Sequence, residues 1–179
     1  MQLNISKLQE DIQEILFSLV APVPVILQEQ EGDKPAESYL TFQLKDWSQI
    51  GSSTQTHVGG TSPDYEIQTL WKVKLNLMSV GVDANQIIIS ISQKLNRTTA
   101  RLDFESIGLK YQYQEDVKHA PKLLTTGWEQ RFHLDACFNI KLIDVEALNY
   151  FEFLYITTNV EDPTGNTVAT NTQVVDIVP

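Results

Sequence analysis

The amino-acid sequence predicts an α+β fold, in which a mainly antiparallel β-sheet carries two helices, an extended loop and a C-terminal arm. Two segments repeat apolar residues every three to four positions, as helices with one buried face do. Several other segments alternate apolar and polar residues, as antiparallel strands with one wet face do. Hydrophobic residues make up 42% of the chain, which is enough for a packed core.

The first predicted helix spans residues 4–20, and the second spans residues 83–99. Asn4 or Ser6 can cap the first helix, and Pro22 stops it because proline lacks the backbone donor that a helix needs. The residues expected on the buried faces are Ile5, Leu8, Ile12, Ile15, Leu16 and Leu19 in the first helix and Ile87, Ile88, Ile91 and Leu95 in the second.

Six segments read as strands, namely residues 24–30, 38–47, 65–80, 107–114, 128–141 and 149–158. Alternation is cleanest in the fifth, where one face is expected to hold Trp128, Phe132, Leu134, Ala136, Phe138 and Ile140. Residues 48–64 are rich in Ser, Thr and Gly, so the sequence predicts a mobile loop there. A second loop is expected over residues 115–127.

The sequence predicts one α+β domain over residues 1–160 and a C-terminal extension over residues 161–179. The extension is rich in Thr, Asn and Val and resembles a tail or a swapped arm. No apolar run reaches the roughly 18–20 residues of a membrane helix, so no membrane partner is expected. The N-terminus lacks a basic stretch followed by an apolar run, so we expect synthesis in the cytoplasm.

The formal net charge is -10, and the acidic residues gather towards both ends of the chain. No Lys, Arg or His follows Lys141, whereas six Asp and Glu residues do. A dedicated nucleic-acid-binding protein normally carries a basic patch, so no sequence-specific binding is expected. Two interpretations remain open: the acidity provides solubility, or it forms a surface that repels DNA or meets a basic partner.

The sequence indicates no enzyme, no metal and no cofactor. His57, His119 and His133 lack the clustered spacing of metal ligands, and the single cysteine, Cys137, lies in a predicted strand. One alternative is a metal-dependent nuclease, which would use Asp64, Asp116 and Lys118 to hold a cation and activate water.

A dense aromatic strand near the C-terminus allows two interpretations. Aromatic residues dominate protein cores, but they are also enriched where subunits meet. The candidate interface residues in this strand are Tyr150, Phe151, Phe153 and Tyr155.

Residues 38–142 resemble the phage tail-terminator and neck proteins of the head–tail junction. The resemblance lies in the order YLTFQL, IQTLWKVKLNLMSV, DANQIIISISQKLN, IGLKYQYQ and WEQRFHLDACFNIKL. The last segment matches best, because it opens with an acidic residue and a basic residue two positions apart, Glu129 and Arg131, which join the candidate interface. The long C-terminal region departs from the minimal core of this family.

The resemblance implies a structural virion protein, which forms a ring, expected to be a hexamer, at the head-proximal end of the tail. Such a ring caps the tail tube and joins it to the head connector or completion protein, and in a sheathed tail it also meets the sheath protein. A tail-completion or connector protein of the same junction is the alternative. Because DNA must pass through the ring, Glu152, Glu161 and Asp162 are the candidate acids of the channel.

Overall fold

The computed structural model describes residues 4–28, 35, 37–57, 64–125, 127–147, 153–161 and 167–176. Side chains are described for residues 4–28, 35, 37–56, 66–125 and 127–144. The chain forms two compact units. Unit 1 comprises residues 1–53 and 68–143, and unit 2 comprises residues 54–67 and 144–179.

Helix α1 (Ile5–Val20) confirms the first predicted helix. Asn4 caps it, because its side-chain Oδ1 accepts a hydrogen bond of 3.1 Å from the backbone N–H of Lys7. One face is buried in the core at four-residue intervals, through Leu8, Ile12, Leu16 and Val20.

The main sheet, most of whose residues belong to unit 1, has the strand order β1-β2-β3-β8-β4, and β5 also pairs with β8. Its strands are β1 (Val25–Leu27), β2 (Tyr39–His57), β3 (Asp64–Val80), β4 (Leu109–Gln114), β5 (Lys118–His119) and β8 (Arg131–Ala147). Strands β4 and β5 are antiparallel to β8, whereas β1 is parallel to β2. The predicted α+β class with a mainly antiparallel sheet is therefore confirmed.

The predicted loop over residues 48–64 is wrong for most of its length. Strand β2 continues to His57 and β3 begins at Asp64, while residues 58–63 lie outside the described part of the chain. Residues 48–56 are all exposed. Ile50 is the one large apolar residue among them, so alternation of apolar and polar residues could not reveal this strand. Pairing with β3 supplies the order that the local sequence does not indicate.

The structure has three helices in its described part rather than the two predicted. Helix α2 (Ala84–Leu95) has Asn96 as its C-cap residue, and a separate helix α3 (Thr98–Ser106) follows. Only Ala100 and Phe104 of α3 are buried, which is too few apolar positions to reveal a helical period.

Gly81 makes the tight turn between β3 and α2 possible. Its φ of +112° is one that side chains disfavour, and an added Cβ would lie 2.6 Å from the Ser38 Oγ. The Ser38 Oγ in turn accepts a hydrogen bond of 3.0 Å from the backbone N–H of Asp83, just before α2.

The predicted loop over residues 115–127 contains short strands. Besides β5, strand β6 (Lys122–Leu124) pairs with β7 (Gly127–Glu129) in a two-stranded hairpin. The predicted strand 128–141 is therefore divided at Gln130 and runs on as β8 to Ala147. Trp128 was expected on the core face, but it lies in β7 and is 65% exposed, so that expectation is wrong.

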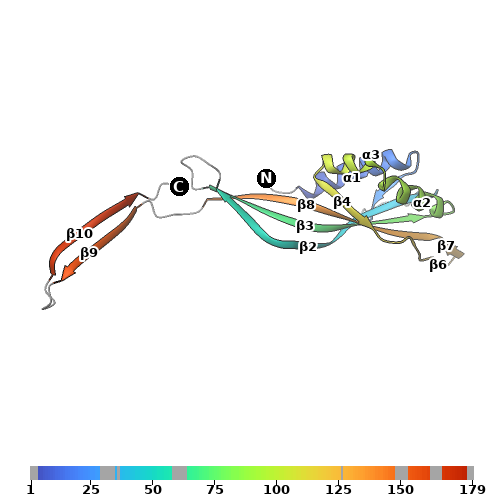
Figure 1. Cartoon of the computed structure of the whole chain (residues 1–179). Coiled ribbons are helices and arrows are strands. Elements are labelled where there is room, and N and C mark those ends of the chain that lie inside the picture. Colours follow the sequence, from blue (N-terminus) through green and yellow to red (C-terminus); the bar gives the residue numbers. More distant parts are fainter. Residues whose placement is uncertain are drawn as a thin grey trace. The chain divides into compact units, whose positions relative to one another are not determined.

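The three helices lie on one face of the sheet, and the core fills the space between the two layers (Figure 1). Phe138 of β8 lies within it, with ring centroids 4.8 Å from Phe104 and 5.6 Å from Tyr111. The odd-numbered residues Val73, Leu75 and Leu77 of β3 are fully buried in the same core. The even-numbered residues of β3 therefore project from the face of the sheet that lies away from the helices.

Unit 2 contains an antiparallel pair of strands, β9 (Phe153–Glu161) and β10 (Thr167–Asp176). The predicted strand 149–158 is confirmed from Phe153 onwards and continues to Glu161, and residues 149–152 lie outside the described part. The expected tail contains a regular strand, β10, because Thr and Val favour extended backbone and β9 supplies a partner.

Candidate assembly surfaces

The predicted aromatic interface and channel acids fall mainly where side chains are not described. Tyr150, Phe151, Glu152 and Asp162 lie outside the described residues. The backbone of β9 holds the remaining three, Phe153, Tyr155 and Glu161, opposite Asp176, Val174 and Thr167 of β10, respectively. Their assignment to an interface or a channel stays a prediction.

Glu129 and Arg131 form an ion pair within unit 1. The Arg131 Nε donates a hydrogen bond of 2.5 Å to the Glu129 Oε2, and a second guanidinium nitrogen lies against the same oxygen. The side chains are only 19% and 15% exposed, respectively. The pair connects the end of β7 to the start of β8, so it has a structural role within unit 1.

The β6–β7 hairpin presents an apolar surface that the sequence analysis did not identify. Leu123 and Trp128 are cross-strand partners, and they are 63% and 65% exposed. Leu124 of the same hairpin is also exposed, at 38%. Large exposed aromatic side chains are typical anchors of protein–protein interfaces. The sequence signal was present in the pair of leucines and the tryptophan around Gly127, but the apparent continuity of strand 128–141 concealed it.

Charged side chains form a network across the helix-free face of the sheet. The Lys74 Nζ lies 3.1 Å from Glu115 and 3.6 Å from Asp46, and the Lys118 Nζ lies 2.9 Å from Glu115. Hydrogen bonds from Lys118 and then Lys74 lower the pKa of Glu115 below its ordinary value. These contacts link β2, β3, β5 and the residue that follows β4, but exposed ion pairs of this kind each contribute little stability.

A second polar cluster lies beside this network. The Asn76 Nδ2 donates a hydrogen bond of 2.6 Å to the Asp135 Oδ1, and the Lys45 Nζ lies 3.5 Å from the same oxygen. Burial lowers the pKa of neighbouring His133, and the charge of Asp135 opposes this effect only in part. His133 and Asp135 are on one face of β8 because they are two residues apart.

The residues of the nuclease alternative do not form a described site. Asp64 begins β3 without a described side chain, Asp116 is exposed, and Lys118 is paired with Glu115. Among the residues with described side chains, no group of three or more His, Cys, Asp or Glu could hold a metal ion. Cys137 is fully buried in β8, which favours a structural thiol over a nucleophile.

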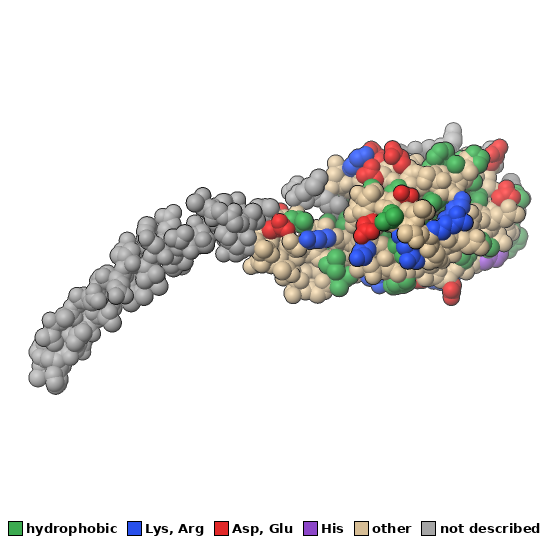
Figure 2. All heavy atoms as spheres, turned by 45° about the horizontal axis from the view of Figure 1, so that its top comes forward, with side chains coloured by type: hydrophobic (Ala, Val, Ile, Leu, Met, Phe, Trp, Pro, Cys, Tyr) green, Lys and Arg blue, Asp and Glu red, His purple; other side chains and the backbone are tan. Residues whose placement is uncertain are grey.

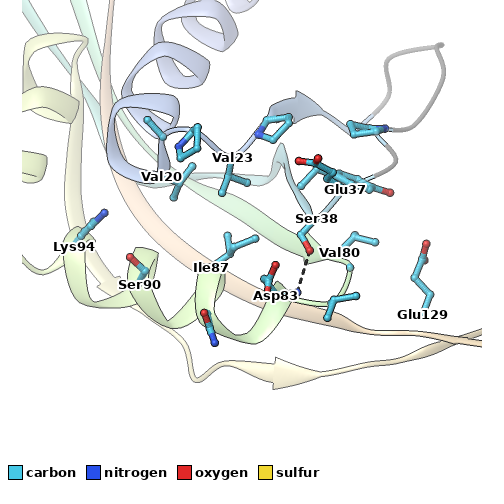
Figure 3. A pocket seen from close by; sticks show the side chains of 18 residues that line it. Val20, Val23, Glu37, Ser38, Val80, Asp83, Ile87, Ser90, Lys94 and Glu129 are labelled. Atoms are coloured by element: carbon cyan, nitrogen blue, oxygen red, sulfur yellow. Dashed lines mark hydrogen bonds between the residues drawn. The ribbon is translucent and has the colours of Figure 1, made fainter.

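A cavity of about 740 Å³ lies beside the turn that follows α1. Figure 3 shows Val20, Val23 and Ile87 on its apolar side, with Ser38 and Asp83 joined by their hydrogen bond. Lys94 and Glu129 lie at separate ends of the view. The labelled polar groups therefore do not converge on one point as the acid, base and nucleophile of an active site would.

Helices in the described part of the chain are too short or too polar to cross a membrane. Seen from the side of the helices, unit 1 carries acidic, basic and hydrophobic side chains next to one another (Figure 2). The mixed surface on the helix side and the apolar β6–β7 hairpin are therefore the candidate contact surfaces of unit 1.

Comparison with known protein families identifies a match that covers most of the chain. A family model described as "Phage neck terminator protein" matches residues 8–172, which is most of the chain. No curated protein matches the sequence.

Proposed function

The chain belongs to the phage neck terminator protein family, and we propose that it forms a ring at the head-proximal end of a phage tail. In this position the ring caps the tail tube and joins it to the head connector or completion protein. The coarser role, that of a structural protein of the phage neck, follows from membership of the family.

The observation that carries the proposal is the extent of the family match. Residues 8–172 include most of α1, all of α2 and α3, the main sheet and most of the β9–β10 pair, so the match is not confined to one element. A structural role also suits a surface with exposed Leu123 and Trp128 on a projecting hairpin. Such side chains gain free energy when a partner removes them from water, at about 25 cal/mol per Å² of apolar surface.

Passage of DNA sets a further requirement for a ring at this position. The genome must slide through without adsorbing, and acidic side chains on the channel wall repel phosphate. Glu152, Glu161 and Asp162 remain our candidates for this wall because the C-terminal region lacks Lys, Arg and His after Lys141.

Electron microscopy of tails tests the position, and the oligomeric mass tests the ring. We expect an antibody or a fused tag on this chain to label one end of each tail, the end that joins the head. We also expect a ring, with a hexamer as the predicted size, when the protein is concentrated or bound to tails. Labelling along the whole tube, or a monomer in both settings, would refute the proposal.

A tail-completion or connector protein of the same junction remains the alternative. The two differ in which neighbour they require. A terminator binds to headless tails, whereas a connector protein remains with tail-free heads. Purification of heads and tails from a phage blocked in joining separates these outcomes.

A further inference from the structure

The sheet in unit 1 has one face without helices (Figure 1). On this face lie lysines that form no ion pair with a carboxylate of the described residues. Lys110 pairs with Asn139 across β4 and β8, so both project from the same face as Lys141, two residues further along β8. Lys72 of β3 reaches this group, since its Nζ donates a hydrogen bond of 2.8 Å to the Tyr113 hydroxyl of β4.

These three lysines differ from the others on the same face. Lys45, Lys74 and Lys118 each lie within 4 Å of Asp135, Asp46 or Glu115. No such ion pair is formed by the described side chains for the three that we call the basic surface, Lys72, Lys110 and Lys141.

The basic surface also has an apolar part. Tyr113 is 46% exposed, and its ring lies 5.0 Å from the Lys72 Nζ. Leu70 is 40% exposed and, as an even-numbered residue of β3, projects from the same face. A partner that fits here therefore combines negative charge with an apolar side chain.

Helix α1 of the same chain has this combination on its outer side. Glu10 and Glu14 are exposed and four residues apart, so they are neighbours on one face and repel each other. Lys7 is the nearest base along the helix, but it forms its ion pair with Asp11, at 2.8 Å. Phe17 follows one turn later and is 50% exposed.

We propose that α1 of one copy docks on the basic surface of the next copy. Glu10 and Glu14 then meet Lys72, Lys110 and Lys141, while Phe17 packs against Tyr113 and Leu70. The two surfaces differ, so the contact is heterologous, and a heterologous contact generates a ring where its rotation closes. The inference deepens the proposed function, on which it rests for the expectation of a ring.

A passing DNA duplex is the competing occupant of the basic surface. The same face carries Asp46, Glu115 and Asp135, which would lie near the phosphates and weaken adsorption. The exposed Leu70 and Tyr113 also match an apolar anchor better than a phosphate backbone. The observations therefore favour the second copy.

Charge reversal in two complementary sets tests the contact. The first variant carries Lys72→Glu, Lys110→Glu and Lys141→Glu, and the second carries Glu10→Lys and Glu14→Lys. A third variant carries all five changes. Control variants carry Arg97→Glu or Glu105→Lys, which reverse exposed charges at the two ends of α3. Circular dichroism and urea unfolding establish that each variant folds.

Self-association is measured by analytical ultracentrifugation, and incorporation into tails is measured by complementation. We expect the first and second variants each to lose association by about tenfold or more, because like charges then face each other. Mixing the two, or combining all five changes in one chain, should restore association, and the controls should behave as the unchanged protein does. Added salt should weaken the restored and the original contact alike.

Several results would overturn the inference. These are unchanged association in either variant, failure of the mixture and of the five-fold variant to recover, or an unchanged protein that associates neither in solution nor on tails. Normal association with lost retention on a duplex-DNA column would assign the lysines to DNA instead. The chain could also associate through these surfaces and yet be absent from the neck of the phage. That result would refute the proposed function but not the contact between copies.

Discussion

Single residues of the core carry much of the stability of unit 1. Phe138 is fully buried between Phe104 and Tyr111, and it connects the sheet to helix α3. A large side chain at such a site contributes both by leaving water and by filling space.

Phe138→Ala should lower the free energy of unfolding by about 3–5 kcal/mol, since it removes buried surface and leaves a cavity. The matched control is Phe17→Ala, whose side chain is 50% exposed and should cost under about 1 kcal/mol. Urea unfolding followed by circular dichroism measures both. Equal losses in the two variants would contradict the assignment of the core.

His133 makes stability depend on pH, because burial lowers the pKa of its imidazole in the folded protein. The unfolded chain then binds a proton more readily than the folded protein does. The contribution of His133 is therefore complete above the ordinary histidine pKa and is lost as the pH falls through the folded-state pKa.

We expect His133→Gln to reduce the loss of stability between about pH 8 and about pH 5, which brackets the ordinary histidine pKa. Urea midpoints of the two proteins, measured across this interval, provide the test. Parallel curves would show that His133 does not contribute to the pH dependence.

At the scale of elements, we expect the exposed β6–β7 hairpin to be a contact surface for another virion protein. Leu123→Ser and Trp128→Ser should change the free energy of unfolding by only about 0.5 kcal/mol each, because both side chains are mainly exposed. Incorporation into tails should fall markedly in a complementation assay. Leu102→Ser is the matched control, since Leu102 of α3 is 58% exposed. Equal incorporation of all three variants would rule out a hairpin contact.

Apolar period determined which elements could be predicted from the sequence. Helix α1 was predicted almost to the residue, and Leu8, Ile12 and Leu16 of its expected apolar face are buried. Ile5 was also expected on that face but is 51% exposed, so this expectation is wrong. The second half of β2 and helix α3 were missed, because the first is exposed on both faces and the second buries only Ala100 and Phe104. Their order comes from pairing with β3 and packing on neighbouring elements, which no local window contains.

The candidate surfaces were harder to predict for a related reason. Glu129 and Arg131 were identified as a pair, and the structure brings them together within one chain. The exposed hairpin and the basic surface depend on which strands become neighbours and which face the helices cover. Alternation in the sequence assigned Trp128 to the core. In the structure the strand breaks at Gln130, and Trp128 lies in a separate hairpin.

At the scale of the whole molecule, the acidic C-terminal region should govern the passage of DNA. The triple change Glu152→Lys, Glu161→Lys and Asp162→Lys should leave unit 1 folded, because all three residues belong to unit 2. Genome ejection should slow, since a basic channel wall adsorbs phosphate. A dye-release or DNA-ejection assay on assembled phage measures the rate.

Two outcomes would count against this role. Normal ejection, with the three residues shown to line the channel, would exclude an electrostatic effect on passage. Failure of the tails to assemble would instead assign these acids to contacts with a partner protein.

Tail length in the absence of this protein tests the central claim most directly. A terminator stops growth of the tail tube, so phage that lack the chain should produce tubes that exceed the normal length and remain unattached to heads. Supplying the protein in trans should restore one length and the joining of heads. Electron microscopy of lysates gives the length distribution. Tails of normal length, joined to heads in the absence of the protein, would contradict the account.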